Sequence, residues 1–139
     1  MNRGRLAGVG VLVVFLGAAC EAHTEAGGGR GVVFPVQQRT NIVLQALLDG
    51  TLIERRSCLY VLSHDGGLKL PIWPRGFSYS TIANDTIVKD AAGGTVARTG
   101  SHVTMGGGEA PRRHPGVPAQ MRSKHAPCHG PYWLVGEID

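Results

Sequence analysis

The chain contains no apolar run long enough to cross a bilayer. Its longest run, residues 6–19, spans about 14 residues, whereas a transmembrane helix needs about 20. Charged residues are scarce, at 17 % of the 139 residues, and there is no internal repeat and no alternation of strand and helix patterns. These absences exclude long coiled coils, multi-span membrane proteins and large two-domain enzymes, and they leave room for one domain.

The composition is that of a globular protein rich in turns. Hydrophobic residues make up 42 %, and the 21 glycines and eight prolines disfavour long helices. Turn signals separate short β-type segments at intervals of roughly 8 to 12 residues. The segments are 43–54, 58–63, 69–73, 77–82, 86–89, 95–98, 102–105 and 132–138. Within the first, Asp49-Gly50 predicts a turn or bulge, and a helix over 42–48 is the alternative there.

Six to eight such strands predict an all-β fold, a small antiparallel barrel or sandwich, preceded by an N-terminal signal helix and a flexible tether. The number of strands and the closing strand at the C-terminus make an OB-like barrel one form of this architecture by analogy. We expect this domain to cover residues 40–139.

A long segment without strand pattern, 106–131, interrupts the domain. It contains no acidic residue between Glu109 and Glu137, and its prolines and glycines predict an irregular loop that is either functional or poorly ordered. Basic side chains near anionic lipid headgroups or wall polymers each contribute about 1 kcal/mol to binding. The candidates for such binding are Arg112, Arg113, Arg122 and Lys124.

The N-terminus has the layout of a bacterial export signal. Arg3 and Arg5 precede the apolar run, and small residues lead to Cys20 as in a lipobox. We therefore expect a signal peptide over 1–19, a lipid on Cys20 and a tether over 20–39, with an edge strand over 32–36 as the alternative for its second half. Ordinary cleavage after Ala19 or Ala22 would instead give a soluble secreted protein. Removing the signal lowers the formal net charge from +4 to +2.

The three cysteines fit the same interpretation. If Cys20 carries the lipid, Cys58 and Cys128 remain as one even pair in an oxidising compartment, which predicts a disulfide. A cross-link closing about 70 residues would stabilise the fold by roughly 4 kcal/mol. The alternative is that Cys58 and Cys128 are metal ligands, or a nucleophile with a spare thiol.

Candidate chemistry is sparse. His114, His125 and His129 could bind copper or zinc, with His102, Met105 or Met121 as further donors, although their spacing matches no recognised chelate. Ser63-His64-Asp65 has the residue types of a hydrolase but cannot form a triad from consecutive positions, so His64 and Asp65 are interpreted as turn residues. We predict no enzymatic activity, no cofactor and no nucleic-acid partner.

Several strings resemble a group of small uncharacterised exported proteins and predicted lipoproteins of high-GC bacteria. The resemblance covers most of residues 50–137 and implies export and the cysteine pair, without an activity or ligand. The strings are C-L-Y (58–60), I-W-P-R-G-F (72–77), V-K-D (88–90), V-A-R-T-G (96–100), M-G-G-G-E (105–109) and C-H-G-P-Y-W (128–133).

Taken together, the sequence predicts a lipoprotein anchored to the outer face of a bacterial membrane, acting as a non-catalytic binding or envelope structural module. The alternatives are an exported metal-handling protein that uses the histidine-rich loop and a soluble secreted protein.

Overall fold

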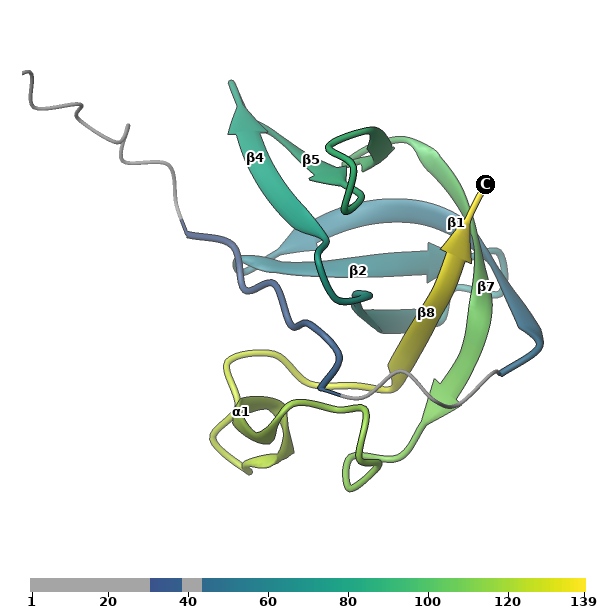
Figure 1. Cartoon of the computed structure of the whole chain (residues 1–139), viewed down its shortest axis with the longest axis vertical. Helices are drawn as coiled ribbons and strands as arrows, with labels where there is room; N and C mark the ends of the chain where they lie inside the picture. Colours follow the sequence, from purple (N-terminus) through teal and green to yellow (C-terminus); the bar gives the residue numbers. More distant parts are fainter. Residues whose placement is uncertain (1–30, 39–43) are drawn as a thin grey trace, which may run out of the picture.

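The fold is all-β, as predicted. A computed structural model describes residues 31–38 and 44–139, and its described helices include none long and apolar enough to cross a membrane. The elements are β1 (Ala46–Arg55), β2 (Cys58–Ser63), β3 (Leu68–Ile72), β4 (Ser78–Ile82), β5 (Asp85–Lys89), β6 (Thr95–Arg98), β7 (His102–Ala110), α1 (Ala119–Arg122) and β8 (Tyr132–Ile138) (Figure 1).

Five strands close into a barrel in the order β1-β2-β3-β8-β7. Neighbouring strands are antiparallel except β3 and β8, which run parallel from Leu70 beside Tyr132 to Ile72 beside Leu134. The prediction of a wholly antiparallel arrangement is therefore wrong for this one pair. The order, with its single parallel pair, is that of an OB-like barrel rather than a sandwich.

The remaining strands form a separate sheet in the order β4-β5-β6, at the top of Figure 1. This sheet shares the main hydrophobic core with the barrel. Val88 and Ala97 of the small sheet belong to the same buried cluster as Leu52 and the fully buried Trp73. Burial of these side chains attaches the small sheet to the barrel.

Strand β1 runs straight through Asp49-Gly50, where the sequence predicted a turn or bulge. Leu48, Gly50 and Leu52 are buried at alternate positions, the period of a strand with one face inward. A Cβ on Gly50 would overlap the carbonyl of Leu62 on the neighbouring strand. The glycine is there because two strands approach closely, and not because the chain turns.

Strand β7 is longer than predicted, since it continues through the three glycines to Ala110. Gly107 has φ +148° and faces the carbonyl oxygen of Leu134, which a Cβ would overlap. Close approach of β7 and β8 therefore accounts for Gly107, one of the three glycines that suggested a loop. The long loop spans 111–131 rather than 106–131.

This loop packs against the outer surface of the barrel. Val117 and Met121 are fully buried, in one cluster with Leu70 and Leu134 of the parallel pair. The hydroxyl of Tyr132 donates a hydrogen bond to the carbonyl of Met121, at 2.8 Å. The loop is thus a second hydrophobic layer over β3 and β8 and carries the short helix α1.

Residues 32–37 belong to the domain and not to a tether. Val33 forms a parallel bridge with Cys58, and Phe34 stacks on Trp73 with ring centroids 5.2 Å apart. The buried Gln37 amide donates to the carbonyls of Ile72 and Val135, which ties β3 to β8. The predicted boundary at residue 40 is therefore too late. Residues 1–30, with the predicted signal and Cys20, lie outside the described residues.

Candidate functional site

The predicted disulfide is present and anchors the candidate site. Cys58, the first residue of β2, is bonded to Cys128 near the end of the β7–β8 loop, with 5.9 Å between their Cα atoms. Both cysteines are buried. This bond excludes the alternative of two free thiols serving as metal ligands or as a nucleophile, and it holds the loop against the β1–β2 turn.

The β1–β2 turn carries two adjacent exposed arginines. Arg56 and Ser57 have φ values of 51° and 63°, so both central residues of this two-residue hairpin adopt the left-handed conformation of a type I′ turn. Asparagine and glycine adopt this conformation most easily, and other residues pay a cost of about 1 kcal/mol or more. The turn therefore presents Arg55 and Arg56 at a conformational cost.

A cavity of about 280 Å³ opens between this turn and the loop. The hydroxyl of Tyr60 donates a 3.3 Å hydrogen bond to the carbonyl of His129 across it. None of the described residues lining it is acidic. We call it the cationic hollow; it is lined by the disulfide together with Arg55, Arg56, Tyr60, Leu68, Pro127 and His129.

The four predicted basic residues of the loop fall into two groups. Arg112, Arg113 and Lys124 are exposed, as surface binding requires. Arg122 is half-buried, and its guanidinium donates to the carbonyl of Val117 at 2.8 Å and to the side-chain oxygen of Gln38 at 3.1 Å. Arg122 therefore connects the loop to the N-terminal segment, and these hydrogen bonds engage the guanidinium that surface binding would need.

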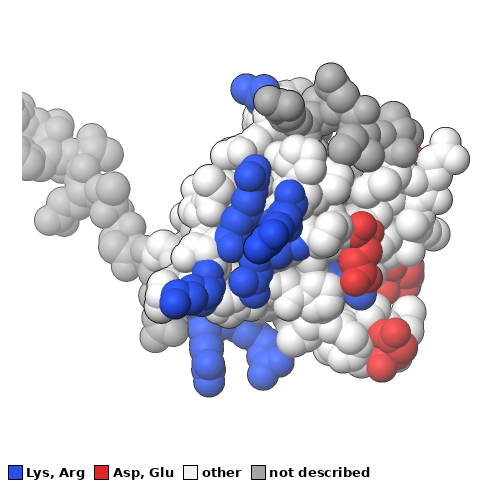
Figure 2. Space-filling view, turned by 90° about the horizontal axis from the view of Figure 1, so that it is seen from below, with Lys and Arg blue, Asp and Glu red and all other residues white. Residues whose placement is uncertain are grey.

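Lysine and arginine side chains gather over the end of the molecule where the loop and α1 lie, and acidic side chains lie to one side of this face (Figure 2). Within residues 31–38 and 44–139, no carboxylate forms an ion pair with the cations of the turn or with the exposed cations of the loop. We call the exposed cations of the turn and of the loop together the cationic end; the disulfide joins these two segments, and the cations are Arg55, Arg56, Arg112, Arg113 and Lys124.

The structure does not bring the predicted loop histidines together. His114 accepts a hydrogen bond at Nδ1 from the amide of Gly116, and His125 and His129 are exposed at separate places on the loop. In the part of the chain that the structure describes, the side chains grouped closely enough to share a metal ion are instead those of Asp49, His64 and His102.

The turn after β2 has the predicted role. Asp65 accepts hydrogen bonds from the Ser63 hydroxyl and the Gly67 amide, and these bonds hold the pKa of its carboxyl below the usual value. His64 points away from Asp65 toward Asp49. Ser63-His64-Asp65 thus forms a turn and no catalytic triad.

Arg55 and Arg56 are the site residues that the sequence analysis missed. They lie two and three positions before Cys58. The predicted Cys58–Cys128 pair could therefore have placed these arginines beside the loop. Comparison with protein families, curated proteins and solved structures finds no match for this chain.

Proposed function

We propose that the protein is an exported bacterial lipoprotein, anchored by Cys20, that acts as a non-catalytic binding module whose cationic end docks on anionic lipid headgroups. The observation that carries this proposal is the position of the N-terminal segment. Val33 pairs with Cys58, and its amide donates to the carbonyl of Ser57 in the arginine turn. The chain therefore enters the barrel at the cationic end.

The N-terminal segment attaches the domain to the membrane beside its cationic end. Val32 lies twelve positions after Cys20, so a lipid on Cys20 keeps this end of the barrel within about 40 Å of the membrane even for a fully extended chain. A domain attached beside its own cationic surface meets the headgroups with that surface first.

The charges are sufficient for a measurable contribution. Each lysine or arginine near an anionic leaflet contributes about 1 kcal/mol, and this attraction fades over about 8 Å at physiological ionic strength. The cationic end has five exposed cations that form no ion pair among the described residues. It should therefore attract anionic lipids more strongly than a surface on which cations are widely spaced. The lipid supplies attachment, and the cationic end supplies orientation.

The test begins with Cys20→Ala, which should move the protein from the membrane fraction to the soluble fraction. In that background, Arg55→Gln/Arg56→Gln should weaken binding to vesicles of phosphatidylglycerol and phosphatidylcholine by roughly 30-fold, since two charges contribute about 2 kcal/mol. Arg112→Gln/Arg113→Gln should have a similar effect. Co-sedimentation with the vesicles measures both, and added salt should weaken the unmodified surface most.

The matched control removes the same charge from the small sheet. Lys89→Gln/Arg98→Gln alters β5 and β6 of the small sheet, which lies at the top of Figure 1, away from the loop and α1, and should leave vesicle binding almost unchanged. If the control and test variants lose vesicle affinity equally, the effect depends on net charge alone and contradicts a docking surface. Retention of Cys20→Ala in membranes would contradict the anchor.

A further inference from the structure

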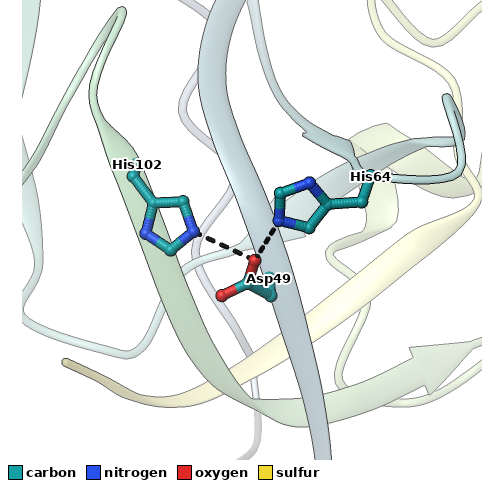
Figure 3. Close-up of side chains that lie close together, drawn as sticks. All are labelled: Asp49, His64 and His102. Atoms are coloured by element: carbon teal, nitrogen blue, oxygen red, sulfur yellow. Dashed lines mark hydrogen bonds and ion pairs between the residues drawn. The ribbon is translucent and has the colours of Figure 1, made fainter.

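Three metal-ligating side chains from three neighbouring segments meet on the outside of the barrel (Figure 3). The Nε2 atoms of His64 and His102 lie 2.7 Å and 3.0 Å from the same oxygen, Oδ1 of Asp49. One potential ligand atom from each residue lies within 4.8 Å of the other two. Both imidazoles therefore present the same ring nitrogen to one carboxylate.

Strand register explains this convergence. Asp49 lies on β1 between β2 and β7, with its neighbour Gly50 opposite Ser63 on one side and Thr104 opposite Asp49 itself on the other. His64 directly follows β2, and His102 begins β7. Because alternate residues of a strand share a face, His102 and Thr104 lie on the same side of β7 as Asp49 does on β1.

We propose that Asp49, His64 and His102 bind one divalent transition-metal ion of the zinc and copper class. Two imidazole nitrogens and one carboxylate oxygen form a donor set that suits both ions. An ion about 2.0–2.1 Å from each ligand places neighbouring ligand atoms about 3.0–3.4 Å apart. The two nitrogen–oxygen distances are close to this spacing, so small side-chain rotations admit the ion.

The surroundings favour binding of a cation. The hydroxyl of Thr104 donates to the second carboxylate oxygen at 3.0 Å, an outer contact of the kind that orients metal ligands. With one oxygen facing both imidazoles and the other held by Thr104, the Asp49 carboxylate has a fixed orientation toward the two histidines.

The site is open to solvent. The side chains of His64 and His102 are 79 % and 58 % exposed, and that of Asp49 is 38 % exposed. Three protein ligands leave at least one coordination position for water or for a ligand from another molecule. An ion at such a site should exchange with solvent, as transient metal binding at a cell surface requires. It would not be a permanent structural part of the fold.

The metal site is separate from the cationic end. Asp49 and Arg55 lie six residues apart on β1, which corresponds to about 20 Å along a strand. A protein docked through the cationic end would keep the three ligands away from the membrane. Failure of either proposal leaves the other intact.

The test uses the untagged protein and titrates Zn²⁺ alone and Cu²⁺ alone by calorimetry. We expect one ion per chain, with Cu²⁺ bound more tightly than Zn²⁺. His64→Ala and His102→Ala should each weaken binding by about tenfold or more, since even outer contacts of a metal site cost about tenfold. Asp49→Asn, which keeps the shape and removes the charge, should also weaken it. Electron paramagnetic resonance of the Cu²⁺ form should show coupling to two imidazole nitrogens.

The matched control is His125→Ala, which removes an exposed imidazole from the loop and should leave the affinity unchanged. Circular dichroism confirms that all variants are folded. A wild-type protein that binds neither ion would overturn the proposal. Binding that survives His64→Ala and His102→Ala but is lost when His114, His125 and His129 are replaced together would also overturn it and assign the metal to the loop.

Discussion

The double variant Cys58→Ala/Cys128→Ala is expected to lose up to about 4 kcal/mol in free energy of unfolding, because the cross-link closes about 70 residues and restricts the unfolded chain. A loss of this size lowers the melting temperature by about 15 °C or more in a domain of this length. The loss also reaches the site, since the bond fixes Pro127 and His129 against the arginine turn. Chemical denaturation monitored by tryptophan fluorescence measures the change.

Reduction of the wild-type protein is the matched control for this variant. Both forms lack the cross-link, so their unfolding free energies should agree. Packing of Val117 and Met121 on the barrel keeps much of the loop in place without the bond, and for this reason the native strands should persist. A loss below about 1 kcal/mol in the double variant would show that the disulfide contributes little beyond this packing.

Gly107→Ala is expected to destabilise the barrel by about 3 kcal/mol or more, because the new Cβ would overlap a backbone carbonyl and because φ is unfavourable for alanine. The overlapping atom is the carbonyl oxygen of Leu134, and Nε1 of Trp133 lies 2.9 Å from the Cβ position. Backbone cannot rotate away as a side chain can, so β7 and β8 must separate. The same denaturation experiment measures this loss.

Gly136→Ala provides the comparison on the adjoining strand. Its Cβ would lie 3.5 Å from the carbonyl oxygen of Gly106, an ordinary contact, and the residue is exposed. We expect a change within about 0.5 kcal/mol there, as for most surface substitutions. Similar losses at both glycines would contradict the close approach of β7 and β8.

Local signals in the sequence were sufficient to predict the strands. Segments 58–63, 95–98 and 132–138 coincide with β2, β6 and β8, and the other strands end within a few residues of their predicted limits except β7. Turn residues such as Asp65 and Gly66 mark these ends, and they act within a few positions of the chain. The Cys58–Cys128 pair was predictable for a different reason, since the chemistry of an exported thiol limits its partners.

Features that depend on strand pairing were not predictable. Gly50 and Gly106 to Gly108 suggested turns or loops, whereas neighbouring strands are the reason for Gly50 and Gly107. The sequence pattern predicts that Asp49 and His64 are turn residues. The strand register that brings Asp49 beside His102 joins positions 53 residues apart in the chain. A sequence pattern with a short period carries no information about such contacts.

The barrel thus presents two kinds of surface, about 20 Å apart along β1. One is cationic, lies beside the entry of the N-terminal segment and is held by the disulfide. The other carries the Asp49, His64 and His102 ligands. Under the two proposals made above, this separation places the metal ion on the side of the domain that faces away from the membrane.

The most direct test of the docked orientation is nuclear magnetic resonance of the lipidated protein on nanodiscs that contain spin-labelled headgroups. We expect the amide signals of Ser57, Arg113 and Lys124 to be broadened most strongly. Those of His64, Thr104 and the exposed Ile82 should be almost unaffected. Strongest broadening at Ile82 or around Asp49, or equal broadening throughout, would contradict docking through the cationic end.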